Sequence, residues 1–214
     1  MENRYIVVEG PIGVGKTSLT NILTERFSAR RILEVVEENP FLSNFYEDRQ
    51  KYAFQTQIFF LLSRFRQQQE LFQQDLFSSV TVSDYLFAKD RIFAYLNLSH
   101  HELALYDRVY DALNTQVVKP DLVIYLQARL DVLLGRIKKR GREFERKFDA
   151  TYLEELSKAY NDFFFHYSET PLLVINTSDI DFVNNPADLE NLLSVIRKTR
   201  KGTHHYIPLG SKRP

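Results

Sequence analysis

A glycine-rich stretch near the start of the chain constrains the fold more than any other feature. An apolar run, Tyr5 to Glu9, leads into it, and a helix-forming stretch, 18–23, follows it. The residues between them fit the pattern G-x-x-x-x-G-K-[ST], which in this strand, loop and helix context predicts a phosphate-binding P-loop. The positions expected to contact a nucleoside triphosphate are Gly10, Pro11, Ile12, Gly13, Val14, Gly15, Lys16, Thr17 and Ser18.

The residue types in this stretch suit an anion. Glycines let backbone N–H groups turn inward around a phosphate, and the helix that follows adds its positive N-terminal end. Lys16 can reach the β- and γ-phosphates, and the Thr17 hydroxyl can hold Mg²⁺. The alternative is a glycine-rich turn without a ligand. Because every motif position and both flanks fit, the sequence predicts a nucleoside triphosphate site.

The composition excludes several classes of function. Lys and Arg total 28 and Asp and Glu total 28, so no overall charge attracts nucleic acid or an anionic membrane. The absence of cysteine excludes disulfides, thiolate metal sites and cysteine nucleophiles. The longest apolar run, Ile58 to Leu62, is too short to cross a bilayer, and the P-loop at Gly10 leaves no room for a signal peptide. We therefore expect a cytoplasmic protein without a nucleic-acid or membrane partner.

Apolar runs and helical patterns alternate along the chain. The runs predicted as strands are 5–9, 31–36, 79–83, 122–126 and 172–176, and a long helix is predicted from residue 50 to about 75. Continuous apolar strands that alternate with helices are typical of a parallel sheet covered on both faces. The sequence therefore predicts an α/β P-loop fold with five parallel strands in one domain, 1–200, and a loose tail, 201–214.

Acidic residues follow two of the predicted strands. Ligands of such sheets bind beyond the carboxyl ends of the strands, so Glu37, Glu38 and Asp84 should lie near the P-loop. Asp84 is placed to hold Mg²⁺ with Thr17, and the alternative is that it caps the next helix. Either Glu37 or Glu38 could act as general base on an acceptor hydroxyl, and the alternative is a solvated acidic turn. Neighbouring extended residues point in opposite directions, so at most one of them faces the site.

A basic segment follows the helix after the fourth strand. Its members are Arg136, Lys138, Lys139, Arg140, Arg142, Arg146 and Lys147. Cations that close over a phosphoryl group stabilise the charge on its oxygens, and Gly141 offers a hinge, so the segment is interpreted as a lid. The alternatives are a solvated helix end and, less favoured in a chain of zero net charge, a nucleic-acid site.

Gln55 and a histidine pair need separate interpretations. Gln55 shares a predicted helix face with Ile58, Phe59 and Leu62, so it is either hydrogen-bonded in the core or faces a polar ligand.

The sequence His100-His101-Glu102 lacks the second histidine of a helical metal motif. We interpret it as surface near the start of a helix.

Four short segments are more specific than the P-loop. They are 37–42 (EENPFL), 45–47 (FYE), 54–57 (FQTQ) and 136–145 (RIKKRGREFE). With them the chain resembles the deoxynucleoside kinase family over nearly its whole length, especially bacterial members of the deoxyadenosine/deoxyguanosine kinase type. The resemblance implies a parallel-sheet P-loop fold, a homodimer, and transfer of the γ-phosphoryl group of ATP, with Mg²⁺, to the 5′-hydroxyl of a deoxynucleoside, with a purine favoured.

The resemblance also implies roles for single residues. Glu38 matches the glutamate that activates the 5′-hydroxyl, with Glu37 as the alternative if the register shifts by one. The substrate-binding matches are Tyr46 and Glu145 for the sugar 3′-hydroxyl, Gln55 for the base edge, and Arg64 with Asp90 for the base pocket. The donor-side matches are Arg140 and Arg142 on the phosphates and Arg136 near the adenine. Lys16, Arg140 and Arg142 would stabilise the transferred phosphoryl group.

The chain departs from the family after the third strand. Many members have an acidic residue followed by Arg and Ser, where this chain has Asp84-Tyr85-Leu86. The arginine that contacts the 5′-oxygen and the transferred phosphate is therefore missing at Tyr85. Either Arg91 or a lid arginine supplies its charge, or the arrangement of the active site differs.

Two other classes remain as alternatives. A nucleoside monophosphate kinase of the thymidylate kinase type binds a dianionic acceptor, which Glu37 and Glu38 would repel. A P-loop switch protein of the GTPase type would read guanine through an Asn-Lys-x-Asp element, which the sequence lacks. The leading hypothesis is a deoxynucleoside kinase in nucleotide salvage.

Overall fold

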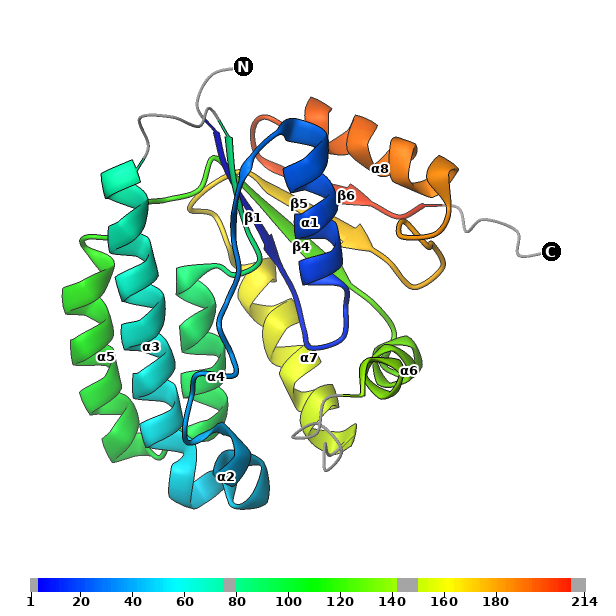
Figure 1. Ribbon diagram of the computed structural model, residues 1–214. Helices are drawn as coiled ribbons and strands as arrows, with labels where there is room; N and C mark the ends of the chain where they lie inside the picture. The colour runs from blue at the N-terminus through cyan, green and yellow to red at the C-terminus, as the bar shows by residue number, and fades with distance from the viewer. Residues whose placement is uncertain (1–3, 75–79, 142–149, 209–214) are drawn as a thin grey trace.

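A six-stranded sheet forms the centre of the molecule, as Figure 1 shows. The structure, a computed structural model, describes residues 4–74, 80–141 and 150–208. The strands are β1 (Arg4–Glu9), β2 (Arg30–Ile32), β3 (Val80–Ser83), β4 (Leu122–Gln127), β5 (Leu172–Asn176) and β6 (Thr203–Tyr206). Their order is β2-β3-β1-β4-β5-β6, and each neighbouring pair is parallel. The predicted α/β fold with a parallel sheet is confirmed.

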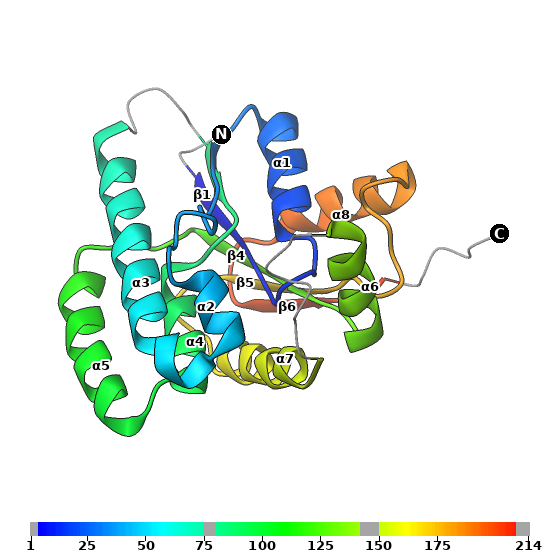
Figure 2. The same ribbon diagram turned by 60° about the horizontal axis from the view of Figure 1, so that its bottom comes forward.

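Helices connect the strands. They are α1 (Lys16–Phe27), α2 (Leu42–Glu47), α3 (Arg49–Gln74), the 3₁₀ turn η1 (Phe87–Lys89), α4 (Asp90–Asn97), α5 (His100–Asn114), α6 (Leu130–Arg140), α7 (Ala150–Phe165) and α8 (Pro186–Lys198). In Figure 2, α1 and α8 lie above the sheet and α4 and α7 lie below it. Among the described residues, no helix has the length and apolar character needed to cross a membrane.

The prediction of five strands was wrong by one. The sixth strand, β6, lies in the segment for which the sequence predicts a loose tail, and it pairs with β5 from Leu172↔Thr203 to Ile175↔Tyr206. Most of its residues are exposed, because it forms the edge of the sheet. An exposed edge strand carries no hydrophobic pattern, so it could not be recognised from apolar runs.

Both faces of the central strands are buried, with alternate side chains in different cores. Ile6 and Val8 of β1 belong to the core that contains Leu23 of α1, whereas Val7 belongs to the core that contains Tyr160 of α7. A strand with period-two side chains can be apolar throughout only if helices cover both faces of the sheet. The continuous apolar runs in the sequence have this origin.

The strand β2 is shorter than the predicted run 31–36. Its partner β3 ends at Ser83, which lies opposite Ile32. Beyond this point the Asp84 carboxylate, instead of a strand, accepts the Glu34 N–H at 2.7 Å. The chain therefore leaves the sheet after Ile32, and the following residues run over the edge of the sheet.

The histidine pair lies where the sequence predicts it. His100 and His101 are exposed at the start of α5. Ser99 and Glu102 form a capping box, in which each side chain accepts a hydrogen bond from the backbone N–H of the other. The Glu102 carboxylate therefore has a structural role at this helix end.

Gly13→Ala tests the close packing of the P-loop on α6. Gly13 has a φ of +84°, and an added Cβ would lie 2.7 Å from Ile137 Cγ1 and 2.9 Å from the Leu133 carbonyl oxygen. We expect the free energy of unfolding in urea to fall by about 1–3 kcal/mol and ATP binding to weaken. Gly135→Ala is the matched control, because its Cβ meets nothing within 4 Å and α6 should gain up to about 1 kcal/mol. Equal stability of the two variants would contradict this packing.

Candidate active site

A cavity opens where three neighbouring strands end. The P-loop follows β1, residues 33–41 follow β2, and η1 follows β3, and these strands are adjacent in the sheet. The cavity is lined by Lys16 from α1, Glu34 after β2, Lys89 from η1, and side chains of α2, α3, α4 and α7. The cavity therefore extends from Lys16 of the P-loop to the side chains of α3 that line it.

The P-loop is held in place by Lys16. Its Nζ donates hydrogen bonds to the carbonyl oxygens of Gly10 at 2.7 Å and Pro11 at 3.3 Å. Gly10, Gly13 and Gly15 have φ values of 151°, 84° and 107°, which L side chains rarely adopt. Burial lowers the pKa of Lys16 although nearby carboxylates oppose this shift. Phosphate oxygens bound in the loop would take over the hydrogen bonds that the two carbonyls now accept.

Thr17 and Asp84 meet as predicted. The Thr17 hydroxyl donates to Asp84 Oδ2 at 2.8 Å, and Asp84 Oδ1 accepts the Glu34 N–H. Asp84 does not cap the next helix, since Leu86 precedes the first residue of η1. Burial raises the pKa of Asp84. A hydroxyl and a carboxylate beside a phosphate site are the oxygen ligands that suit Mg²⁺, which takes its remaining ligands from water and phosphate. Among the described residues, no group of three or more His, Cys, Asp or Glu side chains could hold a metal ion.

The carboxylate in the cavity is that of Glu34. Its Oε1 accepts from Arg64 Nε at 2.8 Å and from Arg64 Nη2, and its Oε2 accepts from Lys89 Nζ at 2.7 Å. Burial alone would raise the pKa of Glu34, but the charges of Arg64 and Lys89 outweigh it and hold that pKa well below its usual range. Glu34 is therefore ionised and can accept a hydrogen bond from a hydroxyl group.

On the side of α3, the cavity ends in a buried polar network. Asp90 is fully buried, and its carboxylate accepts from Arg64 Nη1 and, at 2.9 Å, from the Tyr106 hydroxyl. Gln57 Nε2 donates to the Asp90 carboxylate and, at 3.0 Å, to its carbonyl oxygen. Phe60 and Phe93 add aromatic surface to the cavity. Amide and aromatic groups together suit a planar heterocycle.

The predicted base Glu38 lies outside this cavity. Glu37 and Glu38 are both exposed, and neither lines the cavity, whereas Glu34 does. The prediction took the strand to end at Val36, but β2 ends at Ile32, so the residues beyond the strand begin earlier in the sequence. The signal for Glu34 was a charged residue inside an otherwise apolar run, which the sequence analysis did not use.

The prediction for Gln55 also needs correction. Gln55 is exposed, and the glutamine that lines the cavity is Gln57. Residues two apart on a helix lie about 200° apart around its axis, so only one of the two can face the cavity. Tyr46 and Arg64 line the cavity as expected, and Asp90 lies directly behind Arg64.

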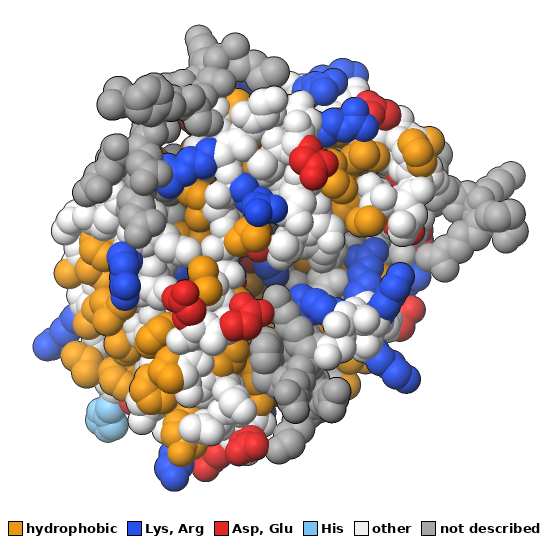
Figure 3. All heavy atoms as spheres, in the orientation of Figure 1, with side chains coloured by type: hydrophobic (Ala, Val, Ile, Leu, Met, Phe, Trp, Pro, Cys, Tyr) orange, Lys and Arg blue, Asp and Glu red, His pale blue; other side chains and the backbone are white. Residues whose placement is uncertain are grey.

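The basic segment is described only in part. Arg142 and Glu145 lie outside the described residues, and Arg140 is exposed in the last turn of α6. Basic side chains gather over α6 in the view of Figure 3. Arg136 donates to the carbonyl oxygens of Val14 and Thr177, both at 2.9 Å, so it joins the P-loop to the segment after β5.

Lys89, which the sequence analysis missed, is a cation that lines the cavity four residues after Tyr85. Tyr85 is fully buried and packs with Ile32. Arg91 points away from the cavity, because its guanidinium lies over the rings of Tyr95 and Tyr110. Lys89 lines the cavity beside Glu34. The expectation that Arg91 replaces the missing arginine was therefore wrong.

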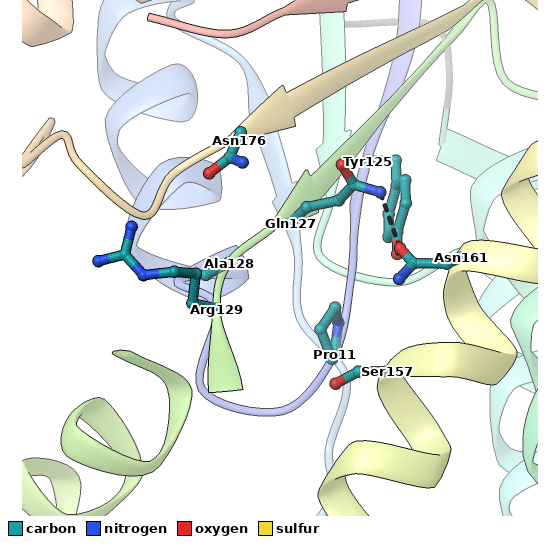
Figure 4. Close-up of a pocket in the computed structure, with 8 residues that line it drawn as sticks. All are labelled: Pro11, Tyr125, Gln127, Ala128, Arg129, Ser157, Asn161 and Asn176. Atoms are coloured by element: carbon teal, nitrogen blue, oxygen red, sulfur yellow. Dashed lines mark hydrogen bonds between the residues drawn. The ribbon is translucent and has the colours of Figure 1, made fainter. Parts of the chain in front are cut away.

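A second hollow adjoins the P-loop at Pro11. It lies at the ends of β4 and β5 and is lined by amide and hydroxyl groups, among them Gln127, Ser157 and Asn176. In Figure 4, Gln127 points toward Asn161 of α7, and its Nε2 donates to Asn161 Oδ1 at 2.7 Å. This hollow lacks the buried carboxylates and lysines of the main cavity.

Comparisons with known proteins agree with this geometry. The deoxynucleoside kinase family model matches residues 6–200. A deoxyguanosine kinase of Bacillus subtilis is 38% identical over 91% of this chain and 96% of its own length. A deoxyadenosine kinase of Lactobacillus acidophilus is 34% identical over 92% of this chain and 97% of its own.

A solved structure has the same architecture. The deoxyadenosine kinase from M. mycoides with bound dATP superposes with a TM-score of 0.76 at 25% identity, and the match covers 91% of this chain and 100% of that one. The sequence match and the shared architecture extend over nearly the whole chain, including the P-loop and the cavity. The chain belongs to the deoxynucleoside kinase family and is a phosphotransferase.

Proposed function

We propose that the protein transfers the γ-phosphoryl group of ATP to the 5′-hydroxyl of a deoxynucleoside in nucleotide salvage, with a purine deoxynucleoside preferred. The observation that carries this proposal is that one cavity contains both Lys16 of the P-loop and the ionised carboxylate of Glu34. A kinase needs a cation on the transferred group and an acceptor for the hydroxyl proton within reach of each other.

Glu34 takes the role that the sequence analysis gave to Glu38. It orients the 5′-hydroxyl and accepts its proton as the new bond to phosphorus forms. A low pKa is compatible with this role, because in a loose transition state the hydroxyl becomes acidic late in the reaction. Lys16, with Arg140 and Arg142 from the lid, stabilises the charge on the phosphoryl oxygens.

Thr17 and Asp84 would hold Mg²⁺ at the phosphates. The bound ion would neutralise part of the triphosphate charge and orient the γ-phosphoryl group. Asp84 accepts hydrogen bonds from both Thr17 and the Glu34 backbone, so the same carboxylate fixes the loop that carries the acceptor base. This arrangement would hold the phosphate site and the acceptor base at a fixed position relative to each other.

The acceptor side suits a nucleoside. Gln57, Arg64 and Tyr46 all line the cavity. Gln57 and Arg64 are proposed to bind the base, and Tyr46 with Glu145 is proposed to bind the sugar 3′-hydroxyl. The purine preference is supported by the relatives, which are named as deoxyguanosine and deoxyadenosine kinases. Arg136 is proposed to contact the donor adenine from its position between the P-loop and Thr177.

The finer assignments follow from the same resemblance. A homodimer in the cytoplasm, with ATP and a deoxynucleoside as its small-molecule partners, is the form that we propose.

A monophosphate kinase is disfavoured, because the carboxylate of Glu34, which lines the cavity, would repel a dianionic acceptor. An enzyme that phosphorylates deoxynucleoside monophosphates, but none of the four deoxynucleosides, would overturn the proposal.

Glu34→Gln should lower kcat for deoxynucleoside phosphorylation by about a hundredfold or more, because the amide cannot accept the hydroxyl proton. ATP binding, measured by calorimetry, should change little, since the P-loop is intact. Glu38→Gln is the matched control and should leave kcat within about twofold, because Glu38 is exposed outside the cavity. The reverse result would restore Glu38 as the base.

Asp84→Asn should raise the free Mg²⁺ concentration required for half-maximal activity by about tenfold or more, because the metal loses an anionic oxygen ligand. Asp111→Asn on the exposed face of α5 is the control and should leave the Mg²⁺ titration unchanged. An unchanged titration for both variants, with wild-type turnover, would remove Asp84 from the metal site.

A further inference from the structure

Lys89 contacts two carboxylates, one at the end of β1 and one just after β2, the two strands that flank β3. Its Nζ lies 2.7 Å from Glu34 Oε2, after β2, and 3.7 Å from Glu9 Oε2, at the end of β1. Because β3 lies between β2 and β1, the segment after β3 is placed to reach both neighbours. Only 2% of Lys89 is exposed, yet it lines the cavity. A buried lysine at a polar cavity is held there by its ion pairs.

Glu9 connects Lys89 to the P-loop. The Glu9 carboxylate accepts the backbone N–H of Gly10 at 2.8 Å, the N–H of Leu86 at 2.8 Å and the Tyr160 hydroxyl at 3.1 Å. The first residue of the P-loop and the segment that leads to Lys89 are therefore bound to one carboxylate. Lys89 links this assembly to Glu34 on the acceptor side.

The hydrogen bonds of Glu34 define which oxygen can receive a substrate. A carboxylate offers about four acceptor sites, two on each oxygen. Arg64 uses both sites of Oε1, through Nε and Nη2, and Lys89 uses one site of Oε2. The second site of Oε2 is the one that a substrate hydroxyl would use. The oxygen that Lys89 holds is thus the oxygen expected to accept the proton.

Other charged and titratable groups also face Glu34. Arg64 comes from α3, Asp84 from the end of β3, Lys16 from α1 and Tyr160 from α7. Arg64 also forms an ion pair with Asp90, which restricts the movement of its guanidinium with Glu34. Lys89 is therefore the cation best placed to fix Oε2.

We propose that Lys89 is a positioning residue for phosphoryl transfer, which orients Glu34 Oε2 toward the acceptor hydroxyl. This inference rests on the proposed kinase function. Lys89, on η1, lines the cavity, whereas Tyr85, four positions earlier in the chain, packs against Ile32 and does not line it.

Lys89→Met tests this role, because methionine keeps most of the side-chain volume and removes the charge. We expect kcat to fall by about a hundredfold while KM for ATP stays within about threefold, since the P-loop lysine is unchanged. KM for the deoxynucleoside should also stay within about threefold, because the loss falls on the orientation of Glu34 Oε2 during transfer. Lys89→Arg keeps the positive charge and should restore part of the turnover.

Arg91→Met is the matched control, since it removes a cation two residues away that faces Tyr95 and Tyr110. Its kcat and both KM values should match those of the wild type. A Lys89→Met enzyme with wild-type kcat, or an Arg91→Met enzyme with the same loss of kcat, would overturn the assignment to Lys89. If the wild type phosphorylates none of the four deoxynucleosides, the proposed function itself fails.

The double variant Glu34→Gln/Lys89→Met covers the case in which Lys89→Met alone does not fold. It removes both charges of the ion pair, so no unpaired charge remains from that pair. If Lys89 acts through Glu34, the double variant should lose no more turnover than Glu34→Gln alone. A double variant that loses about tenfold or more turnover beyond Glu34→Gln alone would show that Lys89 acts independently of Glu34 and overturn the proposal.

Discussion

The place of β3 between β2 and β1 is the constraint on which the site depends. Neighbouring parallel strands lie about 4.8 Å apart, so a segment leaving the middle strand can contact the segments that leave both neighbours. Asp84 does this through Thr17 on one side and the Glu34 N–H on the other. Lys89 also contacts both sides, through ion pairs with Glu9 and Glu34. Donor and acceptor sides are therefore coupled by one short stretch of chain, 84–89.

This coupling has an energetic cost. Glu9, Glu34, Arg64, Lys89 and Asp90 are all largely buried, and each buried charge loses several kcal/mol of hydration that its partner restores only in part. Apolar residues of similar volume would stabilise the fold at least as well. The charges make physical sense as a preorganised environment, in which the dipoles and ions already point at the place where charge develops during transfer.

The sequence predicted the parts of the molecule that local pattern determines. The P-loop, the long α3 helix and the meeting of Thr17 with Asp84 follow from motif, period and strand ends. The errors arose where tertiary context decides. In α3 the apolar period favoured the face of Leu62, which is 47% exposed, whereas the buried face carries Gln57 and Arg64. A helix that lines a polar cavity buries polar residues, so its hydrophobic pattern indicates the wrong face. The length of β2, likewise, depends on where its partner strand ends.

On the proposed function, the buried network around Asp90 determines which groups of a nucleobase the cavity can bind. Gln57 directs its Nε2 to the carbonyl and carboxylate oxygens of Asp90, and the Tyr106 hydroxyl and Arg64 hold that carboxylate in turn. The amide therefore has one orientation, and its Oε1 remains to accept a hydrogen bond from a base. Purine edges carry amino or ring N–H donors that can meet this oxygen. Tyr106, which contacts Asp90, thus helps to fix the Gln57 amide, and Arg64 joins Asp90 to Glu34. On the proposed function, this buried network would connect base recognition at Gln57 to proton acceptance at Glu34.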